Sequence, residues 1–423
     1  MSRIKNYVLG YRCTLCNKFY SKNEEMLTCP TCKDEGILDI EYDYQEIKKV
    51  FYKESLDNNN DYSIWRYLPL LPVKAEFTKN SLRVGYTPLL KSNRLVDKYG
   101  VSELYFKDEG VNPTQSLKDR ASVIACVKAL ELGKKVVACS STGNAASSLA
   151  GNAARLGLRT VIFVPKRAPI GKLAQLLAFG ADVIKVDGDY KKAYSLSKKA
   201  IDYYGWYNRN AAINPNLIEG KKTVALEIAE QLDFKVTDWV IVSVGDGCTI
   251  GGVYKGFFDL LSLKMIKKIP KILGVQASGC SPFYDAFKEN RKLEETEELT
   301  YADSIAVGIP RNPIKGMNAV KLSNGDFIAV TDDEIKEAMK ELGSSEGIFA
   351  EPAAAASYAG FIKAIETNII NKEETVTVII TGNGLKDTAS ALKSLNEPSL
   401  LSDSLEELVK YMNAKGKEDL KNE

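Results

Sequence analysis

The segment Asn112-Pro-Thr-Gln-Ser-Leu-Lys118-Asp-Arg120 places one lysine among small hydroxyl residues, directly before a run over 121–132 that predicts an amphipathic helix. A lysine at a helix N-terminus feels the positive end of the helix dipole, which favours its neutral amine. A neutral amine can condense with an aldehyde, and Thr114, Ser116 and the free backbone N–H groups suit an anion close by. A lone lysine at a helix start is more often solvated than reactive. Whether Lys118 is reactive is therefore judged from the other motifs of the sequence.

Three further stretches each join an apolar strand to a polar or glycine-rich turn. The expected strands are 135–139, 240–244 and 376–380, and the turns that follow them are 140–148, 245–252 and 381–387. In open α/β sheets ligands bind where strands end and helices begin. A glycine-rich turn lets backbone N–H groups close around a phosphate. One such turn can be plain punctuation, but three together with the lysine favour pyridoxal phosphate as a cofactor.

The same residues, in this order, resemble the fold type II pyridoxal phosphate enzymes, the superfamily of the tryptophan synthase β-subunit. The matching motifs are Lys107–Arg120, Ser141–Asn144, Gly251-Gly252 and Thr381–Asp387, with Gly85–Leu89 as the early segment and Glu351-Pro-Ala as the late one. Within the superfamily they are most similar to the motifs of the threonine synthases. The resemblance covers residues 80 to 395 and is more specific for the superfamily than for one reaction.

The resemblance implies an α/β fold with two open, mostly parallel sheets flanked by helices. Alternating apolar strands and helices beyond residue 80 also favour a mostly parallel sheet covered on both faces. The expected organisation is a zinc-ribbon-like module over 1–45, a large cofactor-binding domain over 46–119 and 211–423, and a smaller mobile domain over 120–210. The resemblance further implies a homodimer.

Site roles can be carried over by position. Lys118 is expected to bind the cofactor's aldehyde and to shuttle protons as the catalytic residue. Asn144 would hydrogen-bond the cofactor's 3-hydroxyl oxygen, and Thr381 would face its pyridine nitrogen. A neutral hydroxyl there favours elimination and replacement over transamination. The loop expected to hold the 5′-phosphate is Gly245, Asp246, Gly247, Cys248 and Thr249, and the expected substrate-binding residues are Ser141 and Thr142.

The sequence also departs from the family. Asn383 stands where the last motif usually has histidine. Leu217 stands where threonine synthases carry an arginine that grips the substrate phosphate, and leucine cannot make bidentate contacts to phosphate. Arg209, Lys221 or Lys222 could substitute for it, but the direction of their side chains does not follow from the sequence. Arg311 is a further residue expected to approach the site by resemblance, with a surface turn as the alternative.

Three functions follow as expectations. The first is a pyridoxal-phosphate-dependent carbon–oxygen lyase acting on phosphates: a threonine synthase that converts O-phosphohomoserine and water to threonine and phosphate by γ-elimination and β-replacement. The second is a β-elimination or β-replacement enzyme, such as a threonine or serine ammonia-lyase or a phosphoserine- or acetylserine-type synthase. Leu217 favours that branch, because it leaves open which leaving group is accepted. The third is a non-catalytic cofactor-binding regulator.

Composition narrows the choice of chemistry. The 423 residues contain no histidine, which excludes Ser-His-Asp hydrolysis and zinc hydrolysis with histidine ligands. A net charge of +2 gives no indication of a nucleic-acid or membrane surface, and a small amino-acid substrate is the expected partner. No apolar run approaches the ~20 residues of a membrane helix, and no signal-peptide pattern is present. Singly scattered cysteines favour a reducing, cytoplasmic compartment.

The N-terminal region contains two C-x2-C pairs, Cys13 with Cys16 and Cys29 with Cys32, separated by twelve residues. Two such turns can present four thiolates tetrahedrally, which is the geometry of a structural zinc ribbon. Iron and four reduced thiols without metal are the alternatives. A closed four-cysteine site leaves no open coordination position, so no catalysis is expected there.

Periodicity predicts the remaining elements. The expected strands are 136–139, 160–164, 182–186, 240–244, 272–275 and 376–380, and helices are expected at 172–179 and 223–231.

Overall fold

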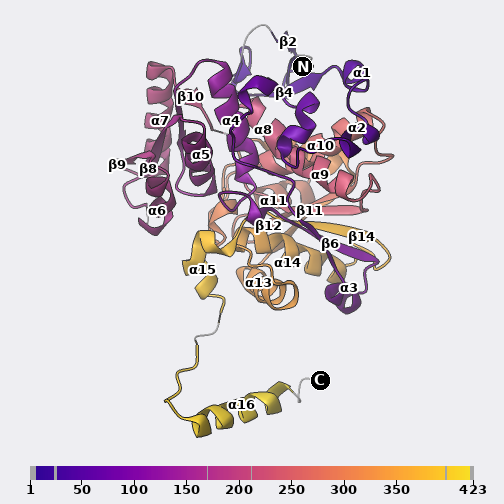
Figure 1. The fold of residues 1–423 in the computed structure, drawn as a ribbon, viewed down its shortest axis with the longest axis vertical. Helices are drawn as coiled ribbons and strands as arrows, with labels where there is room; N and C mark the ends of the chain where they lie inside the picture. Colours follow the sequence, from indigo (N-terminus) through magenta and orange to yellow (C-terminus); the bar gives the residue numbers. More distant parts are fainter. Residues whose placement is uncertain (1–5, 23–25, 169, 211, 396–397, 420–423) are drawn as a thin grey trace.

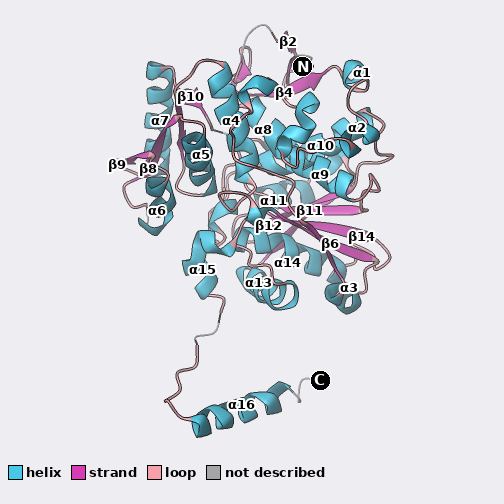
Figure 2. Cartoon of the chain, viewed as in Figure 1, coloured by secondary structure: helices cyan, strands magenta, loops and turns pink. Residues whose placement is uncertain are grey.

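The computed structural model describes residues 6–22, 26–168, 170–210, 212–395 and 398–419, and this part of the chain forms three β-sheets surrounded by helices (Figure 1). No helix in the described ranges is long and apolar enough to cross a membrane. Figure 2 shows strands grouped inside the body with helices on their faces. The α/β class with two mostly parallel sheets is confirmed.

The largest sheet has six strands in the order β13-β12-β11-β14-β6-β5. All neighbours are parallel except the edge strand β5, which runs antiparallel to β6. The strands are β5 (Leu89–Ser92), β6 (Glu103–Asp108), β11 (Trp239–Ser243), β12 (Lys271–Ala277), β13 (Asp326–Val330) and β14 (Thr375–Ile380).

Helices cover both faces of this sheet. On β11, Val240 and Val242 pack into one core, whereas Trp239 and Ile241 pack into the other, as the two-residue repeat of a strand requires. The first core contains residues of α9 (Thr223–Gln231), α10 (Cys248–Ser262), α11 (Pro282–Lys288) and α12 (Pro313–Leu322). The second contains residues of α3 (Arg94–Tyr99), α13 (Asp332–Glu346) and α14 (Pro352–Glu366).

A smaller parallel sheet lies beside the large one, in the order β10-β7-β8-β9 (Figure 1). Its strands are β7 (Val136–Ser140), β8 (Arg159–Pro165), β9 (Asp182–Val186) and β10 (Tyr207–Asn208). One face packs against α4 (Lys118–Glu131), α5 (Asn144–Arg155) and α6 (Ile170–Ala178), and the other against α7 (Tyr190–Tyr204). All of its strands come from residues 136–208, which fall inside the range 120–210 expected for the smaller domain.

The N-terminal sheet is antiparallel, in the order β2-β1-β4-β3. Its strands are β1 (Val8–Cys13), β2 (Phe19–Ser21), β3 (Thr28–Cys29) and β4 (Lys33–Tyr42), and α1 (Tyr44–Ile47) and α2 (Lys53–Asp57) follow. Leu38 and Ile40 of β4 share a core with α9 and α10, so this sheet packs onto the large one.

The remaining elements connect and extend the sheets. Helix α8 (Pro215–Lys221) precedes α9, and the 3-10 turns are η1 (Ile64–Leu70), η2 (Ala75–Phe77), η3 (Glu109–Val111), η4 (Asp303–Ile305) and η5 (Gly384–Asp387). Helix α15 (Thr388–Leu392) follows η5. Helix α16 (Leu405–Asp419) extends away from the body (Figure 1).

The six predicted strands are confirmed as β7, β8, β9, β11, β12 and β14, and the two predicted helices as α6 and α9. Strands β5, β6, β10 and β13 were not predicted. The helix after Lys118 is also confirmed, but its amphipathic character is wrong. Every residue of α4 from Asp119 to Ala129 is buried, because α5 and α8 pack on it from different sides.

Candidate active site

Two sequence motifs that lie far apart in the chain meet at the end of strand β14. The backbone N–H of Leu117 donates to the carbonyl of Thr381 at 2.9 Å, and Ser116 forms an isolated bridge with Gly382. The N–H of Asn383 donates to the carbonyl of Gln115 at 3.1 Å. The segment that carries Lys118 is therefore fixed against the turn that carries Thr381.

The residues on either side of the lysine anchor it. Asp119 accepts hydrogen bonds from the backbone N–H and the hydroxyl of Thr114, both at 2.7 Å, and from Asn152 at 2.8 Å. Arg120 is fully buried and its guanidinium is paired with two carboxylates, Glu109 and Glu227. Because hydrogen bonds and ion pairs fix both Asp119 and Arg120, the start of α4, which carries Lys118, is held in one position.

Lys118 is the first residue of α4 and is partly exposed. Burial lowers the pKa of its amine, and the positive charge of Arg209 lowers it further; Cys248, Asp246 and Glu351 oppose this shift. A lowered pKa raises the neutral fraction that can react with an aldehyde. The groups that act on Lys118 also identify its surroundings: the turn before α10, the loop after β10 and the start of α14.

Asn144 begins α5 after the turn that contains Ser141 and Thr142. Its amide donates to both carboxylate oxygens of Glu351, at 2.9 and 3.0 Å, and the Glu351 N–H donates to the Gly382 carbonyl at 3.0 Å. These bonds connect the end of β7 to the end of β14. Burial raises the pKa of Glu351. The sequence marked Glu351 as part of the late motif but gave it no role.

The turn from β11 to α10 has the form of an anion cradle. Gly247 has a φ of 84°, and a Cβ there would lie 2.6 Å from the Asn312 carbonyl, so only glycine fits. Cys248 then begins a helix of 15 residues, whose first N–H groups lack partners within the helix. Gly245, Asp246 and Thr249 are partly exposed on this turn. Its backbone suits a phosphate ester.

The expected site residues fit pyridoxal phosphate as a group. The amine of Lys118 can bind an aldehyde, and the start of α10 can bind a phosphate. Within the described residues, no hydrogen bond involves the hydroxyl of Thr381, and that of Ser116 is buried without a partner. Ser141 and Thr142 are partly exposed in the turn before Asn144, where Ser141 accepts from the Gly143 N–H at 3.2 Å.

Arg311 lies beside the turn before α10. Its backbone N–H donates to the Asp246 carboxylate at 3.3 Å, and its guanidinium is 4.4 Å from the ring centre of Tyr194 and 5.4 Å from that of Tyr190. The hydroxyl of Tyr190 donates to the Ser140 carbonyl at the end of β7, at 3.3 Å. Arg311 thus contacts both the turn before α10 and helix α7, which differs from the alternative of a surface turn.

Leu217 and Lys222 do not contribute side chains to this region. Leu217 is fully buried in the core of the small sheet with residues of α4. Lys222 is paired with Glu219 and lies 2.6 Å from Asp259, under the N-terminal sheet. Three basic residues were expected as possible substitutes for the missing arginine. Of these, Arg209 and Lys221 remain as candidates for binding the substrate phosphate.

The four N-terminal cysteines converge. Their Sγ atoms all lie within 4.8 Å of one another. The N–H groups of Cys16 and Cys32 point to the sulfurs of Cys13 and Cys29, both at 3.5 Å. Gly36 is required beside them, since a Cβ there would lie 2.5 Å from that of Cys29. The donor set and its closeness fit a tetrahedral metal ion.

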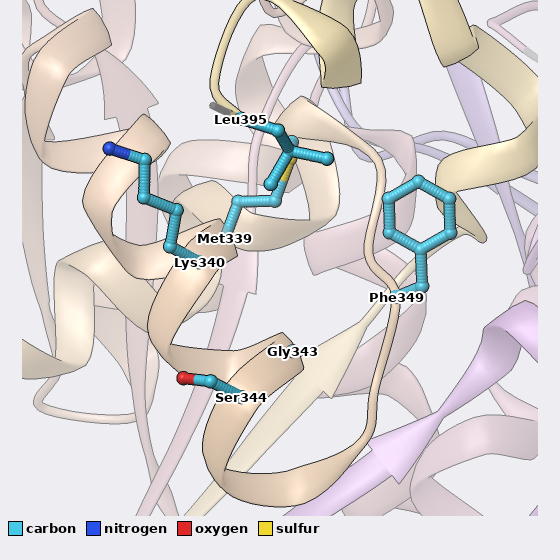
Figure 3. Close-up of a pocket in the computed structure, with 6 residues that line it drawn as sticks. All are labelled: Met339, Lys340, Gly343, Ser344, Phe349 and Leu395. Atoms are coloured by element: carbon cyan, nitrogen blue, oxygen red, sulfur yellow. The ribbon is translucent and has the colours of Figure 1, made fainter. Parts of the chain in front are cut away.

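A separate apolar hollow lies on the surface between α13 and the segments near Phe349 and Leu395 (Figure 3). None of the predicted site residues lines it.

Comparison with known proteins agrees with this geometry. The family model described as "Pyridoxal-phosphate dependent enzyme" matches residues 81–382. The chain belongs to this family of pyridoxal-phosphate-dependent enzymes. Its fold is similar to that of a processed threonine deaminase isoform 2 from Solanum lycopersicum, with a TM-score of 0.64 and 24% identity over 80% of this chain and 93% of that one.

Closer relatives refine the class. The chain is 42% identical to the threonine synthase of Methanocaldococcus jannaschii over 390 residues, which are 92% of this chain and 95% of the relative. It is 39% identical to that of Methanosarcina acetivorans over 409 residues, 96% and 99% of the two chains. At this identity and coverage it belongs, within the family, to the threonine synthases.

Proposed function

We propose that the protein is a threonine synthase that converts O-phosphohomoserine and water to threonine and phosphate. The observation that carries the proposal is the convergence of Lys118, the Asn144–Glu351 pair and the turn before α10, in a chain 42% identical to a threonine synthase. The test is to incubate purified protein with pyridoxal phosphate and O-phosphohomoserine and to measure threonine and free phosphate in equal amounts.

Each residue has a part in this reaction. When bound, pyridoxal phosphate supplies a conjugated ring that stabilises negative charge at the substrate's Cα. The Lys118 amine would hold the cofactor, and the same amine, when free, would take the α-proton of the substrate. The first N–H groups of α10, with Gly245 to Thr249, would hold the cofactor's phosphate. Asn144 would hold the cofactor through its 3-hydroxyl oxygen, and Thr381 would offer a neutral hydroxyl to its nitrogen.

Ser141 and Thr142 are proposed to bind the substrate, because the turn that carries them is partly exposed beside Asn144. A second proton movement, at Cβ, must precede loss of the γ-phosphate. In a chain without histidine, the released phosphate is available as a base for the later steps.

The second candidate is a β-elimination or β-replacement enzyme, which Leu217 in place of the expected arginine favours. It predicts 2-oxobutyrate from threonine, or turnover of serine, phosphoserine or acetylserine, in place of threonine from O-phosphohomoserine. The third is a regulator without turnover. It predicts that no amino acid changes the cofactor's absorption spectrum.

We also propose that the four cysteines bind a structural zinc ion. The proximity of their sulfurs supports this. Metal analysis of the purified protein should give one zinc per chain, and a variant with Cys13 and Cys16 replaced by serine should give none. One iron per chain, or no metal, would support the alternatives.

A homodimer is proposed as well. Leu405, Leu408, Val409 and Met412 form an apolar stripe at helical spacing on α16, and each is at least 43% exposed. Light scattering should give twice the mass of one chain, and removal of residues 398–423 tests whether α16 contributes. The mobility of the domain over 120–210 and the cytoplasmic location remain predictions.

A further inference from the structure

Lys221 lies at the point where three helices meet. A Cβ on the preceding Gly220 would lie 2.1 Å from the Arg120 carbonyl, so α8 crosses α4 within three residues of Lys118. A Cβ on Gly252 of α10 would lie 3.0 Å from the Cβ of Lys221. Lys221 is therefore placed between the start of α4, which carries the reactive amine, and the start of α10, which carries the phosphate turn.

Arg209 approaches the same region from the loop after β10. Its guanidinium donates to the hydroxyl of Ser122 at 3.0 and 3.1 Å. Ser122 is four residues after Lys118, so the two lie on one face of α4. The positive charge of Arg209 acts on both Lys118 and Lys221.

These two cations lack the counter-charges that buried cations normally have. Lys221 and Arg209 are each 2% exposed, yet neither forms an ion pair with a carboxylate in the described part of the chain. The amine of Lys221 also has no hydrogen bond among these residues. The charge of Asp246 raises the pKa of Lys221, but the two form no ion pair among the described residues. Beside Arg209, the side-chain nitrogen of Asn210 is buried without a partner.

We propose that Lys221 and Arg209 form an oxyanion subsite that binds the phosphate monoester of the substrate, in place of the arginine that Leu217 replaces. The inference rests on the proposed function and deepens it. Buried cations are stable when paired, and a dianion between them supplies the missing charge. The turn before α10 offers its own N–H groups to the cofactor's phosphate, which leaves the two side-chain cations for a second anion.

The electrostatics support this geometry. Burial and the charges of Lys118 and Arg209 lower the pKa of Lys221 to about 8, while Cys248 and Asp246 oppose the shift. Burial also lowers the pKa of Arg209. Both groups therefore gain from a bound anion, and phosphate binding should weaken as pH rises through about 8 and Lys221 loses its proton.

The test compares the holoenzyme with Lys221→Gln and, as a matched control, with Lys199→Gln, which removes an exposed lysine from α7. Three quantities are measured: the Kd of inorganic phosphate by calorimetry, the Kd of pyridoxal phosphate, and KM and kcat for O-phosphohomoserine. Lys221→Gln should raise the phosphate Kd and the KM by roughly 10- to 100-fold, since a charge-assisted hydrogen bond is lost. Its kcat and cofactor Kd should stay within about 3-fold.

A conservative variant adds a second readout. Lys221→Arg should restore phosphate binding at neutral pH and keep it at pH values above 8, because the guanidinium stays charged there. A merely structural lysine would give no such change in the pH profile.

The outcomes separate the two proposals. If the wild type forms no threonine but phosphate binding still depends on Lys221, the proposed function fails and the subsite stands. If Lys221→Gln weakens cofactor binding and leaves the phosphate Kd of the holoenzyme unchanged, the cations serve the cofactor's phosphate and the subsite proposal is overturned. It is also overturned if Lys221→Gln behaves like Lys199→Gln in all three measurements.

Discussion

Adjacent lysines at the end of α8 have opposite surroundings. Lys222 faces the N-terminal sheet, where it is paired with Glu219 and Asp259 and lies 4.2 Å from the ring centre of Tyr42. Lys221 lies where the charges of Lys118, Arg209 and Asp246 act on its amine, and it has no ion pair among the described residues. Both are buried, so burial alone does not distinguish a structural charge from a functional one. The presence or absence of a paired carboxylate does.

The paired region extends over several elements. Lys255 and Tyr44 both bond the same oxygen of Asp259 at 2.6 Å, and Tyr42 donates to Glu219 at 2.9 Å. This cluster joins β4 and α1 to α8 and α10. Around Lys118, by contrast, the positive charge of Arg209 lowers the pKa values of both Lys118 and Lys221, and the charge of Lys118 lowers the pKa of Lys221 further. Unpaired buried charges are typical of functional sites, where a bound anion can offset their electrostatic cost.

The largest expected effect comes from Lys118, the reactive member of the unpaired group. Lys118→Ala should lower threonine formation by at least roughly 10²- to 10⁴-fold, because the group that transfers the α-proton is lost. The thermal midpoint of the cofactor-free protein should not fall, since no ion pair involves Lys118 in the described part of the chain. A steady-state assay and a thermal scan check this. Retention of a tenth of the wild-type rate would remove Lys118 from the chemistry.

The comparison between the two lysines is tested directly by stability. Lys222→Met should destabilise the protein by about 3–5 kcal/mol, because it leaves two buried carboxylates, Glu219 and Asp259, with Lys255 as the one cation paired with them within the described ranges. Lys221→Met, the matched control one residue away, should be neutral or stabilising, because it removes an unpaired buried cation. Urea unfolding of both variants measures the difference. Equal losses would mean that Lys221 has a partner in solution.

A pH titration sharpens the same contrast. The pKa of Lys221 is lowered from 10.5 to about 8 in the folded protein. Below about pH 8 the amine is protonated in both the folded and the unfolded protein. Between about pH 8 and pH 10.5 the unfolded protein binds more protons than the folded one. Stability relative to Lys221→Met should therefore be constant below about pH 8 and rise up to about pH 10.5. The full gain is on the order of 3 kcal/mol, from a difference of about 2.5 pKa units. A flat difference across this range contradicts the burial of an unpaired amine.

Much of the site could be predicted from the sequence, because local patterns carry it. Short runs of neighbouring residues predict the helix start at Lys118, the turn before Cys248 and the strand before Thr381. The two C-x2-C pairs likewise predicted a four-cysteine site, and the four sulfurs lie within 4.8 Å of one another.

What the sequence could not supply depends on residues far apart in the chain. Strand β6 was missed because Lys107 interrupts its apolar pattern, yet Lys107 is fully buried and lies 2.8 Å from Glu227, more than a hundred residues away. The direction of Lys221 against that of Lys222 follows from how α8 packs between α4 and α10. Neither the Lys107–Glu227 ion pair nor the different directions of the two lysines can be predicted from a single sequence.

The smallest expected effect comes from an exposed pair that joins the N-terminal sheet to α7. Asp34 and Lys198 lie 2.8 Å apart, with side chains 76% and 43% exposed. Solvent and salt screen such a pair, so Asp34→Asn should cost at most about 1 kcal/mol in urea unfolding, and less at high salt. Lys222→Met, whose ion pairs are buried, should keep its loss at high salt. A large cost for Asp34→Asn that salt does not reduce would mean that the N-terminal sheet and the small sheet are coupled by more than this contact.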